Sequence, residues 1–397
     1  MNLVNATKMQ TAFVMGLDAN GRELLIVAIK GTFTIPKDGM EPELAEIQAP
    51  LVYADEFTGE PGFSAIRYEY DFCTFKPRCD VLLNGSAYAP KGKPVKRVTV
   101  ALEVGRMKKR FNVVGNRVWK RGWILRAKPS RPKPFRVMPI SYDNAYGGVD
   151  NLHPKPRKHL TYLPNFAGQG YFPRSRVGDI KGKPVPNTEE VWTSIKRAGR
   201  KYRPMAFGSL GRAWVPRREF AGTYDQKWID HTFPFLPKDF DPRYNQSAPA
   251  DQQIDYIRGG EAVTLTHLMP QSPITFRLPT IDMPVLFTRK SGEETEIHAT
   301  NDTLLLEPDL NRFILVWRAV LPLKRNIFEM DQVIVGRMPS AWYRARATGK
   351  HYFSSLQEFI VEKEQQVKAL ADAHEEVNDT EKTQEMEDIE ELLEAPL

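Results

Sequence analysis

The chain has 397 residues, of which 41% are hydrophobic, 11% aromatic and 26% charged, with a formal net charge of +7 and two cysteines. This composition can fill a packed core and excludes a chain that is disordered throughout, while the length suggests two domains. No apolar run reaches the roughly 20 residues of a membrane-spanning helix, and the N-terminus lacks the pattern of a signal peptide. We therefore expect a cytoplasmic protein that has no membrane partner.

Residues 1–135 are predicted to form an N-terminal β domain. Runs rich in Val, Ile, Thr and Phe, separated by Gly, Pro and Asn, occupy residues 22–35, 79–90, 96–105 and 107–119. Cys73 and Cys79 have neither a paired-thiol spacing nor a nearby His, so we expect reduced thiols with a structural role.

A basic run overlaps the end of this domain. Residues 105–137 hold twelve Lys and Arg residues and no Asp or Glu. Such a run can bind phosphates, but residues 108–136 contain no helix-turn-helix, zinc-finger or RNP pattern. We therefore interpret the run as a solvated strand face or as a dock for an acidic protein surface, with nucleic-acid binding as the weaker alternative.

Residues 136–261 are predicted to form a connecting region rich in Pro, Gly and aromatic residues, without a helical or strand period. Long connections of this kind tend to be functional or disordered, and the aromatic content argues against disorder. A second β domain is predicted over residues 262–345, with strand runs at residues 262–269, 273–279, 283–289, 295–308 and 311–323. The expected fold is thus mainly β, with two antiparallel β-sandwich-like halves joined by long loops.

The C-terminal part is predicted to be helical and then acidic. Within residues 346–377, a helix is expected from residue 355 to residue 377, because Ser355 and Glu358 have the spacing of a capping box. Residues 378–397 form an acidic tail, and residues 361–397 together hold 13 Asp and Glu against three Lys and Arg. Three interpretations of the tail stay open: a solubilising segment, a docking peptide, or an autoinhibitory segment that covers the basic face.

No sequence pattern indicates an activated nucleophile, a metal site or a bound cofactor. His153 and His159 lie in a basic loop that opposes a metal ion, and Ser209 lacks the Gly-x-Ser-x-Gly spacing of a hydrolase nucleophile. Gly147 and Gly148 lack the flanking Lys and helix of a phosphate-binding loop, so we interpret them as part of a turn. We therefore expect no cofactor, no metal and no catalytic activity.

Three carboxylates support an alternative. Asp225, Asp239 and Asp241 lie close together in the sequence and could serve as acid and base in a carbohydrate-active enzyme, as binding residues in a carbohydrate-binding protein, or as calcium ligands. Asp in such a context more often folds a turn by accepting hydrogen bonds from its own backbone, so we prefer a structural role.

Several motifs carry a resemblance to a known family. They are "YDNAYGG" at residues 142–148, "PMAFGSLGRAWVPR" at residues 204–217, "AGTYDQKWIDHTFPFLPKDFDPRYNQSAPADQQ" at residues 221–253, the hairpin at residues 96–119 and "LVWRAVLPL" at residues 315–323. Over about residues 10–335 the chain resembles a family of domains of unknown function that are encoded beside type VI secretion spike genes and act as effector adaptors. The element "LPNFAGQGYF" at residues 163–172 departs from the family pattern.

The resemblance implies a non-catalytic adaptor or chaperone, whose partners are a toxin effector and the type VI spike protein or its tip. We expect Tyr224, Trp228 and their neighbours to form a buried, hydrogen-bonded loop scaffold that offers part of its surface to a partner. The residues assigned to partner binding or to the motif scaffold are Tyr142, Asn144, Tyr146, Gly147, Gly148, Gly222, Tyr224, Asp225, Trp228, Asp239, Phe240, Asp241, Asp251 and Gln252.

Overall fold

The structure is a computed structural model, which describes residues 1–37, 40–122, 127–173 and 177–349, together with residues 352, 360, 361, 363 and 364. The chain divides into two compact units, Met1–Arg337 and Met338–Leu397. All strands of the described residues belong to the first unit.

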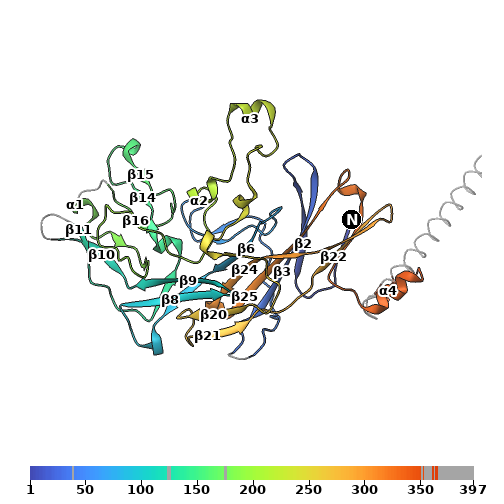
Figure 1. Ribbon diagram of the computed structural model, residues 1–397, viewed down its shortest axis with the longest axis horizontal. Helices are drawn as coiled ribbons and strands as arrows, with labels where there is room; N and C mark the ends of the chain where they lie inside the picture. The colour runs from blue at the N-terminus through green and yellow to red at the C-terminus, as the bar shows by residue number, and fades with distance from the viewer. Residues whose placement is uncertain are drawn as a thin grey trace, which may run out of the picture. The chain divides into compact units, whose positions relative to one another are not determined.

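The largest sheet has six strands, in the order β19-β6-β24-β25-β3-β2 (Figure 1). These strands are β19 (Gln253–Ile254), β6 (Cys79–Leu83), β24 (Thr300–Glu307), β25 (Arg312–Pro322), β3 (Glu23–Thr34) and β2 (Gln10–Leu17). β3 and β25 each carry a long apolar run and are buried along most of their length, as strands covered on both faces are. They pair antiparallel, whereas β6 runs parallel to β24.

A second sheet of five strands has the order β18-β9-β8-β20-β21. Its strands are β18 (Thr188–Glu189), β9 (Met107–Val114), β8 (Arg97–Val104), β20 (Ala262–Thr266) and β21 (Ile274–Arg277). Buried residues alternate with more exposed ones along β8, so one face of this sheet is apolar. Val100 and Leu102 of β8 share one hydrophobic core with Val27 and Ile29 of β3, and the two sheets therefore pack as a sandwich.

A third sheet of four strands has the order β1-β26-β22-β23. Its strands are β1 (Asn2–Asn5), β26 (Met330–Val335), β22 (Pro284–Arg289) and β23 (Glu294–His298). β1 lies parallel to β26, so the N-terminus of the chain pairs with the last strand of the first unit.

Short strands and helices complete the first unit. The short strands are β4 (Glu56–Phe57), β5 (Ile66–Tyr68), β7 (Gly85–Tyr88), β10 (Arg117–Arg121), β11 (Ala127–Pro129), β12 (Val137–Ile140), β13 (Tyr146–Gly147), β14 (Val149–Asp150), β15 (Leu160–Thr161), β16 (Gln169–Gly170) and β17 (Pro184–Val185). The α-helices are α1 (Val177–Ile180), α2 (Val215–Arg218) and α3 (Gln226–His231). Single 3₁₀ turns span Pro90–Gly92, Tyr142–Asn144, Pro156–Lys158, Pro242–Asn245, Ala250–Gln252, Pro308–Leu310 and Ile327–Glu329.

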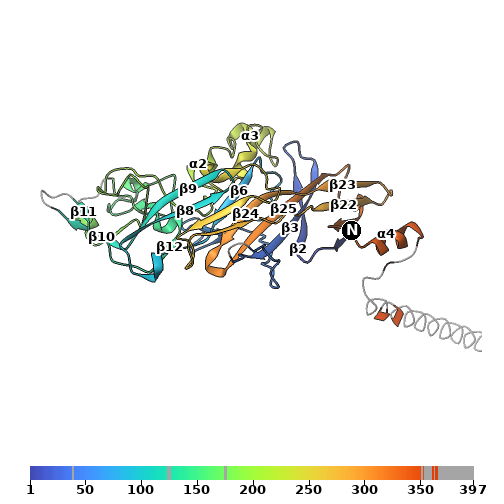
Figure 2. The ribbon, with the colours of Figure 1, turned by 60° about the horizontal axis from the view of Figure 1, so that its bottom comes forward.

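Residues 115–203 form a lobe at one end of the first unit, where Figure 2 shows β10 and β11. The lobe has a hydrophobic cluster of its own, which includes Trp119, Tyr146, Val185 and Tyr202. The irregular connection expected over residues 136–261 therefore contains much of a packed lobe as well as loops.

The mainly β fold is confirmed, and each predicted strand run contains at least one strand of the structure. The sheets combine strands from both predicted β domains, because β3 pairs with β25, β8 with β20 and β6 with β24. Boundaries at residues 135 and 262 therefore do not separate the sheets. Local sequence patterns reveal strands but not their partners, which lie far away in the chain.

The second unit is described only in part. It contains helix α4 (Ser340–Ala347), which the sequence did not predict, and residues 360, 361, 363 and 364 are helical. The rest of the helix expected over residues 355–377, and the acidic tail at residues 378–397, lie outside the described residues. Within the residues that the structure describes, no helix is long and apolar enough to cross a membrane.

Candidate functional site

Residues 221–240 form an arm that leaves the body of the first unit and returns to it, with helix α3 at its end (Figure 1). Hydrogen bonds close the root of the arm: the Thr223 backbone N–H donates to Asp239 Oδ1 at 3.0 Å, and the Thr223 hydroxyl donates to Asp239 Oδ2 at 2.7 Å. Gly222 has a φ of 82°, and a Cβ atom there would lie 2.9 Å from the Cβ of Pro237. The tight turn at the root therefore requires glycine.

Trp228 holds the end of the arm together. Its backbone N–H donates to Asp225 Oδ1 at 2.9 Å, which makes Asp225 the N-cap of α3. The indole packs edge-on against Tyr224 and Phe233, with ring centroids 4.8 Å and 5.5 Å apart, and its Nε1–H donates to the carbonyl oxygen of Phe235 at 2.9 Å. The arm is thus ordered by its own side chains and by the Phe235 ring, which lies against Gly21 between β2 and β3.

The arm presents apolar side chains to solvent. Tyr224 is 53% exposed, Ile229 54% and Phe233 66%. The expectation that Tyr224 and Trp228 belong to a buried scaffold is wrong, since Tyr224 is exposed and Trp228 is only half-buried. A short excursion with one small helix has too little chain to cover its own aromatic rings, although its predicted hydrogen bonds are present.

The three carboxylates of the carbohydrate alternative all accept backbone hydrogen bonds. Asp225 and Asp239 do so as described, and Asp241 Oδ1 accepts from the backbone N–H of Arg243 at 2.8 Å. The Thr223 hydrogen bonds lower the pKa of Asp239, and the side-chain and backbone hydrogen bonds of Arg243 lower the pKa of Asp241. The local role predicted for these residues is confirmed for Asp225 and Asp241, which cap α3 and the 3₁₀ turn at Pro242–Asn245, whereas Asp239 binds Thr223 across the root of the arm. This bonding argues against a facing acid and base pair.

Phe240 and Tyr244 pack against each other at the base of the arm, with ring centroids 5.9 Å apart. The backbone N–H of Asp241 donates to the carbonyl oxygen of Phe220 at 3.0 Å, so the two ends of the arm are joined there. Phe240 is half-buried and thus belongs to the scaffold that carries the arm.

The motif at residues 142–148 lies away from the arm, in the lobe. Tyr142 is buried and packs edge-on against Trp214, with ring centroids 5.3 Å apart. The Tyr146 hydroxyl donates to the carbonyl oxygen of Arg200 at 2.8 Å. The backbone carbonyl oxygen of Asn144 accepts from the backbone N–H of Asn187 at 2.8 Å. These contacts give the motif a structural role, in which Tyr146 packs in the lobe and Tyr142 in the main hydrophobic core.

Gly147 and Gly148 continue this motif, and the element at residues 163–172 binds to it. The Asn165 side-chain amide donates to the carbonyl oxygens of Tyr142 and Tyr146, at 2.9 Å and 3.1 Å. Gly148 has a φ of 92°, and its backbone N–H donates to the carbonyl oxygen of Asn165 at 2.9 Å. A Cβ atom on Gly148 would collide with the carbonyl oxygen of Gly168. The element that departs from the family pattern therefore supports the 142–148 motif.

Asp251 and Gln252 connect the two large sheets. Lys109 of β9 donates to Gln252 Oε1 at 2.6 Å and lies 3.1 Å from Asp251 Oδ1, while the Gln252 amide donates to the carbonyl oxygens of Val81 and Phe207. Burial lowers the pKa of Lys109 to about 8, although Asp251 acts in the opposite direction. This pair has a structural role, and it lies apart from the arm in the sequence and in its contacts.

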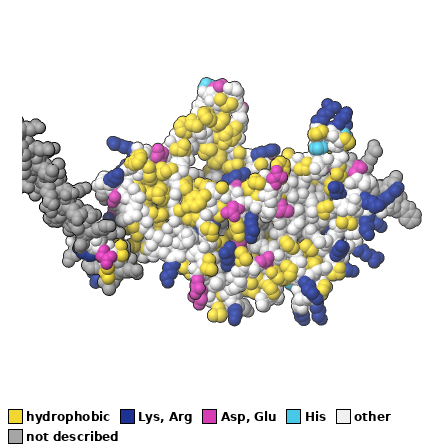
Figure 3. Space-filling view, turned by 180° about the vertical axis from the view of Figure 1, so that it is seen from behind, with side chains coloured by type: hydrophobic (Ala, Val, Ile, Leu, Met, Phe, Trp, Pro, Cys, Tyr) yellow, Lys and Arg dark blue, Asp and Glu magenta, His cyan; other side chains and the backbone are white. Residues whose placement is uncertain are grey.

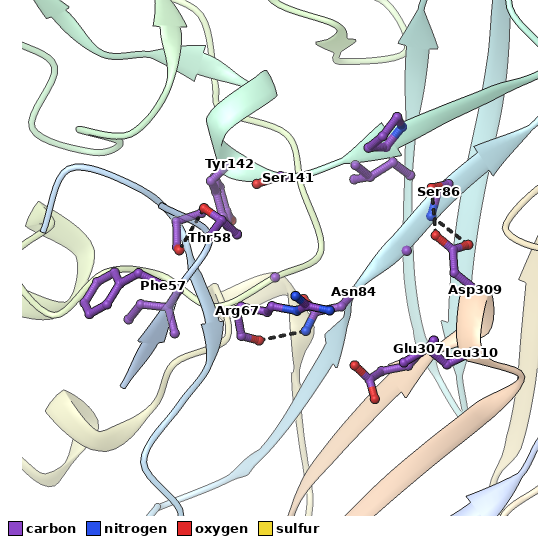
Figure 4. A pocket seen from close by; sticks show the side chains of 16 residues that line it. Phe57, Thr58, Arg67, Asn84, Ser86, Ser141, Tyr142, Glu307, Asp309 and Leu310 are labelled. Carbon is purple, nitrogen blue, oxygen red and sulfur yellow. Dashed lines mark hydrogen bonds between the residues drawn. The ribbon is translucent and has the colours of Figure 1, made fainter. Parts of the chain in front are cut away.

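A cavity of about 380 Å³ was not predicted from the sequence (Figure 4). Two carboxylates face it but are already engaged: Glu307 accepts from the Tyr68 hydroxyl at 2.6 Å, and Asp309 accepts from the Ser86 hydroxyl at 2.7 Å. Arg67 extends into it and has no carboxylate partner among the described residues. The lining residues are Phe57, Thr58, Ala65, Ile66, Arg67, Asn84, Gly85, Ser86, Pro139, Ile140, Ser141, Tyr142, Gly208, Glu307, Asp309 and Leu310. They come from six separate segments between residues 57 and 310, so no local sequence signal identifies the cavity.

No group of three or more His, Cys, Asp and Glu side chains arranged to hold a metal ion occurs within the part of the chain that the structure describes. Cys73 and Cys79 are free and buried, in agreement with the thiols expected from the sequence. Burial raises the pKa of both thiols, which keeps them protonated and poorly reactive.

Comparison with known proteins places the chain in a family. A family model of uncharacterized proteins conserved in bacteria, DUF2169, matches residues 20–318, a span that includes the arm, the 142–148 motif and the Asp251–Gln252 pair. No curated protein and no solved structure matches the chain. Because the match covers most of its length, the chain belongs to the DUF2169 family.

Proposed function

We propose that the chain is a cytoplasmic, non-catalytic adaptor that binds a toxin effector and assists its loading onto the type VI secretion spike protein or its tip. The motif resemblance suggests this role. The structural observation that supports it best is the exposed aromatic arm at residues 221–240.

The arm has the properties of a protein-binding element. Aromatic side chains bury a large area at low cost in side-chain entropy, and they dominate the energetics of protein interfaces. The contacts of Trp228 and Asp225 order the arm in the isolated chain, so a partner does not bear the full entropic cost of ordering it. Exposed rings such as Phe233 and Tyr224 are then available for a partner to cover.

Capture of the effector tests the proposal. The tagged full-length chain is co-expressed with the proteins encoded beside its gene, and the effector is expected to co-purify with it. If the effector does not co-purify with the chain at any ratio of the two proteins, the adaptor function is contradicted.

A pair of matched variants tests the arm. Ile229→Ala combined with Phe233→Ala should weaken effector binding about tenfold or more, because both side chains are exposed and truncation removes apolar contact area. Phe328→Ala is the control, since Phe328 is 76% exposed but lies in another part of the first unit. Equal binding by both variants would remove the arm from the interface while leaving the adaptor function intact.

The absence of catalysis is tested separately. The purified chain is assayed against glycan, peptide, nucleotide and ester substrates, and no turnover is expected. Turnover that disappears in Asp239→Asn would contradict the proposal and favour the carbohydrate alternative.

A further inference from the structure

The lobe at residues 115–203 is strongly basic. It holds 20 Lys and Arg residues against five Asp and Glu residues. Among its described Lys and Arg side chains, Arg117 alone is buried, where it pairs with Glu189 at 2.6 Å, and all the others are exposed. Figure 3 shows Lys and Arg side chains gathered at this end of the first unit.

Two lysines on the lobe repel each other across a sheet. Lys120 of β10 and Lys128 of β11 are directly paired in the antiparallel register, and both are exposed. Neither has an ion pair within the described residues. Like charges in this position destabilise a sheet, so a nearby anionic partner would relieve a repulsion that the isolated fold contains.

The described residues of the lobe show none of the features by which proteins commonly bind nucleic acids. Its one described α-helix, α1, has four residues, which is too short to read a groove. Trp119, Tyr146 and Tyr202 are buried in its core, so they cannot stack on bases. Among the described aromatic residues of the lobe, Trp192 alone is exposed, at 88%, and one Trp offers less stacking surface than the successive aromatic side chains of single-strand binders.

We infer that the basic lobe is a docking surface for an acidic protein segment, separate from the aromatic arm. Opposite charge draws the segment to the lobe, and Lys120 and Lys128 then gain a shared anionic neighbour. The inference goes beyond the effector proposal, because it concerns another surface and a partner of different chemistry. An adaptor with both surfaces can hold two proteins at once.

Binding of simple anionic probes tests this inference without a known partner. The probes are a labelled peptide of about 20 glutamates and a single-stranded DNA of about 20 nucleotides, which carry similar charge and are compared at about 50 mM and 200 mM salt. The lobe variant is Lys120→Glu with Lys128→Glu. The control is Arg258→Glu with Lys290→Glu, because these residues are exposed outside the lobe and the charge change is the same.

The glutamate peptide should bind the wild type at low salt. We expect the lobe variant to weaken this binding about tenfold or more, whereas the control should stay within about twofold of the wild type. The single variant Lys120→Glu separates docking from folding: it places opposite charges across the sheet, so it should melt at the same temperature or higher and still bind the peptide less tightly.

Three results would overturn the inference. They are the absence of peptide binding by the wild type at low salt, equal weakening by the lobe and control variants, and tighter binding of the DNA than of the peptide at the same salt. The last of these would identify a nucleic-acid surface instead.

Discussion

Asp80 is the residue whose substitution should destabilise the fold most clearly. It lies in β6, is 0% exposed, and its carboxylate meets Lys76 Nζ at 2.8 Å. It also accepts from the Gln246 amide at 2.7 Å, from the Ser247 backbone N–H at 2.8 Å and hydroxyl at 3.1 Å, and from the Ala248 backbone N–H at 3.1 Å. One carboxylate therefore ties the chain that follows the arm to β6 of the six-stranded sheet.

Asp80→Asn keeps the shape of the side chain and removes its charge. The Lys76 ammonium would stay buried with Glu69 3.5 Å away as its remaining ion-pair partner, and the new amide would point N–H groups at donors that now bind an oxygen. Removing one partner of a buried ion pair costs about 3–5 kcal/mol, a large part of the 5–15 kcal/mol that typically stabilises a domain. We therefore expect a marked fall in the urea concentration at the unfolding midpoint.

Chemical denaturation followed by circular dichroism and by tryptophan fluorescence measures this change. Asp255→Asn is the matched control, because Asp255 is fully exposed and faces Arg78 at 3.4 Å, so its midpoint should not move. If Asp80→Asn unfolds at the same urea concentration as this control, the network around Asp80 does not stabilise the fold.

Three further predictions concern the scaffold. Lys109 has a pKa of about 8 in the fold and about 10.4 in the unfolded chain, so the unfolded state binds more protons between these two pH values. The free energy of unfolding of the wild type should therefore rise by about 2–3 kcal/mol relative to that of Lys109→Met between about pH 8 and pH 10. A difference between the two proteins that stays constant with pH would contradict this. Gly148→Ala should lower the free energy of unfolding, measured by thermal denaturation, by at least about 2 kcal/mol, because Gly148 has a positive φ and the added Cβ atom would clash with the backbone. Gly178→Ala should be tolerated, since Gly178 has open space around it. Trp228→Ala should leave the melting temperature of the first unit nearly unchanged. Tyr146→Ala removes a ring from the hydrophobic cluster of the lobe and should lower the free energy of unfolding by about 3–5 kcal/mol.

Much of the site could be predicted from the sequence at the level of hydrogen bonding. Asp225 before a helix and Asp241 before Pro242 are local signals of caps and turns, and the structure has both. The exposure of Tyr224 was not predictable in this way, because burial depends on whether the rest of the chain comes near. The cavity at Arg67 was missed for the same reason, since Glu307 reaches it from a segment far along the chain.

The sequence by itself determined where strands form, because alternating or continuous apolar runs such as those of β3, β8 and β25 specify extended, buried segments locally. It also determined that the charge is unevenly distributed along the chain. Only the tertiary structure decided that β3 pairs with β25 and β8 with β20, so that both ends of the matched region form one sandwich. It likewise decided which aromatic residues face solvent and which charges meet across a sheet. Pairing and exposure depend on contacts between residues hundreds of positions apart, and no local pattern encodes them.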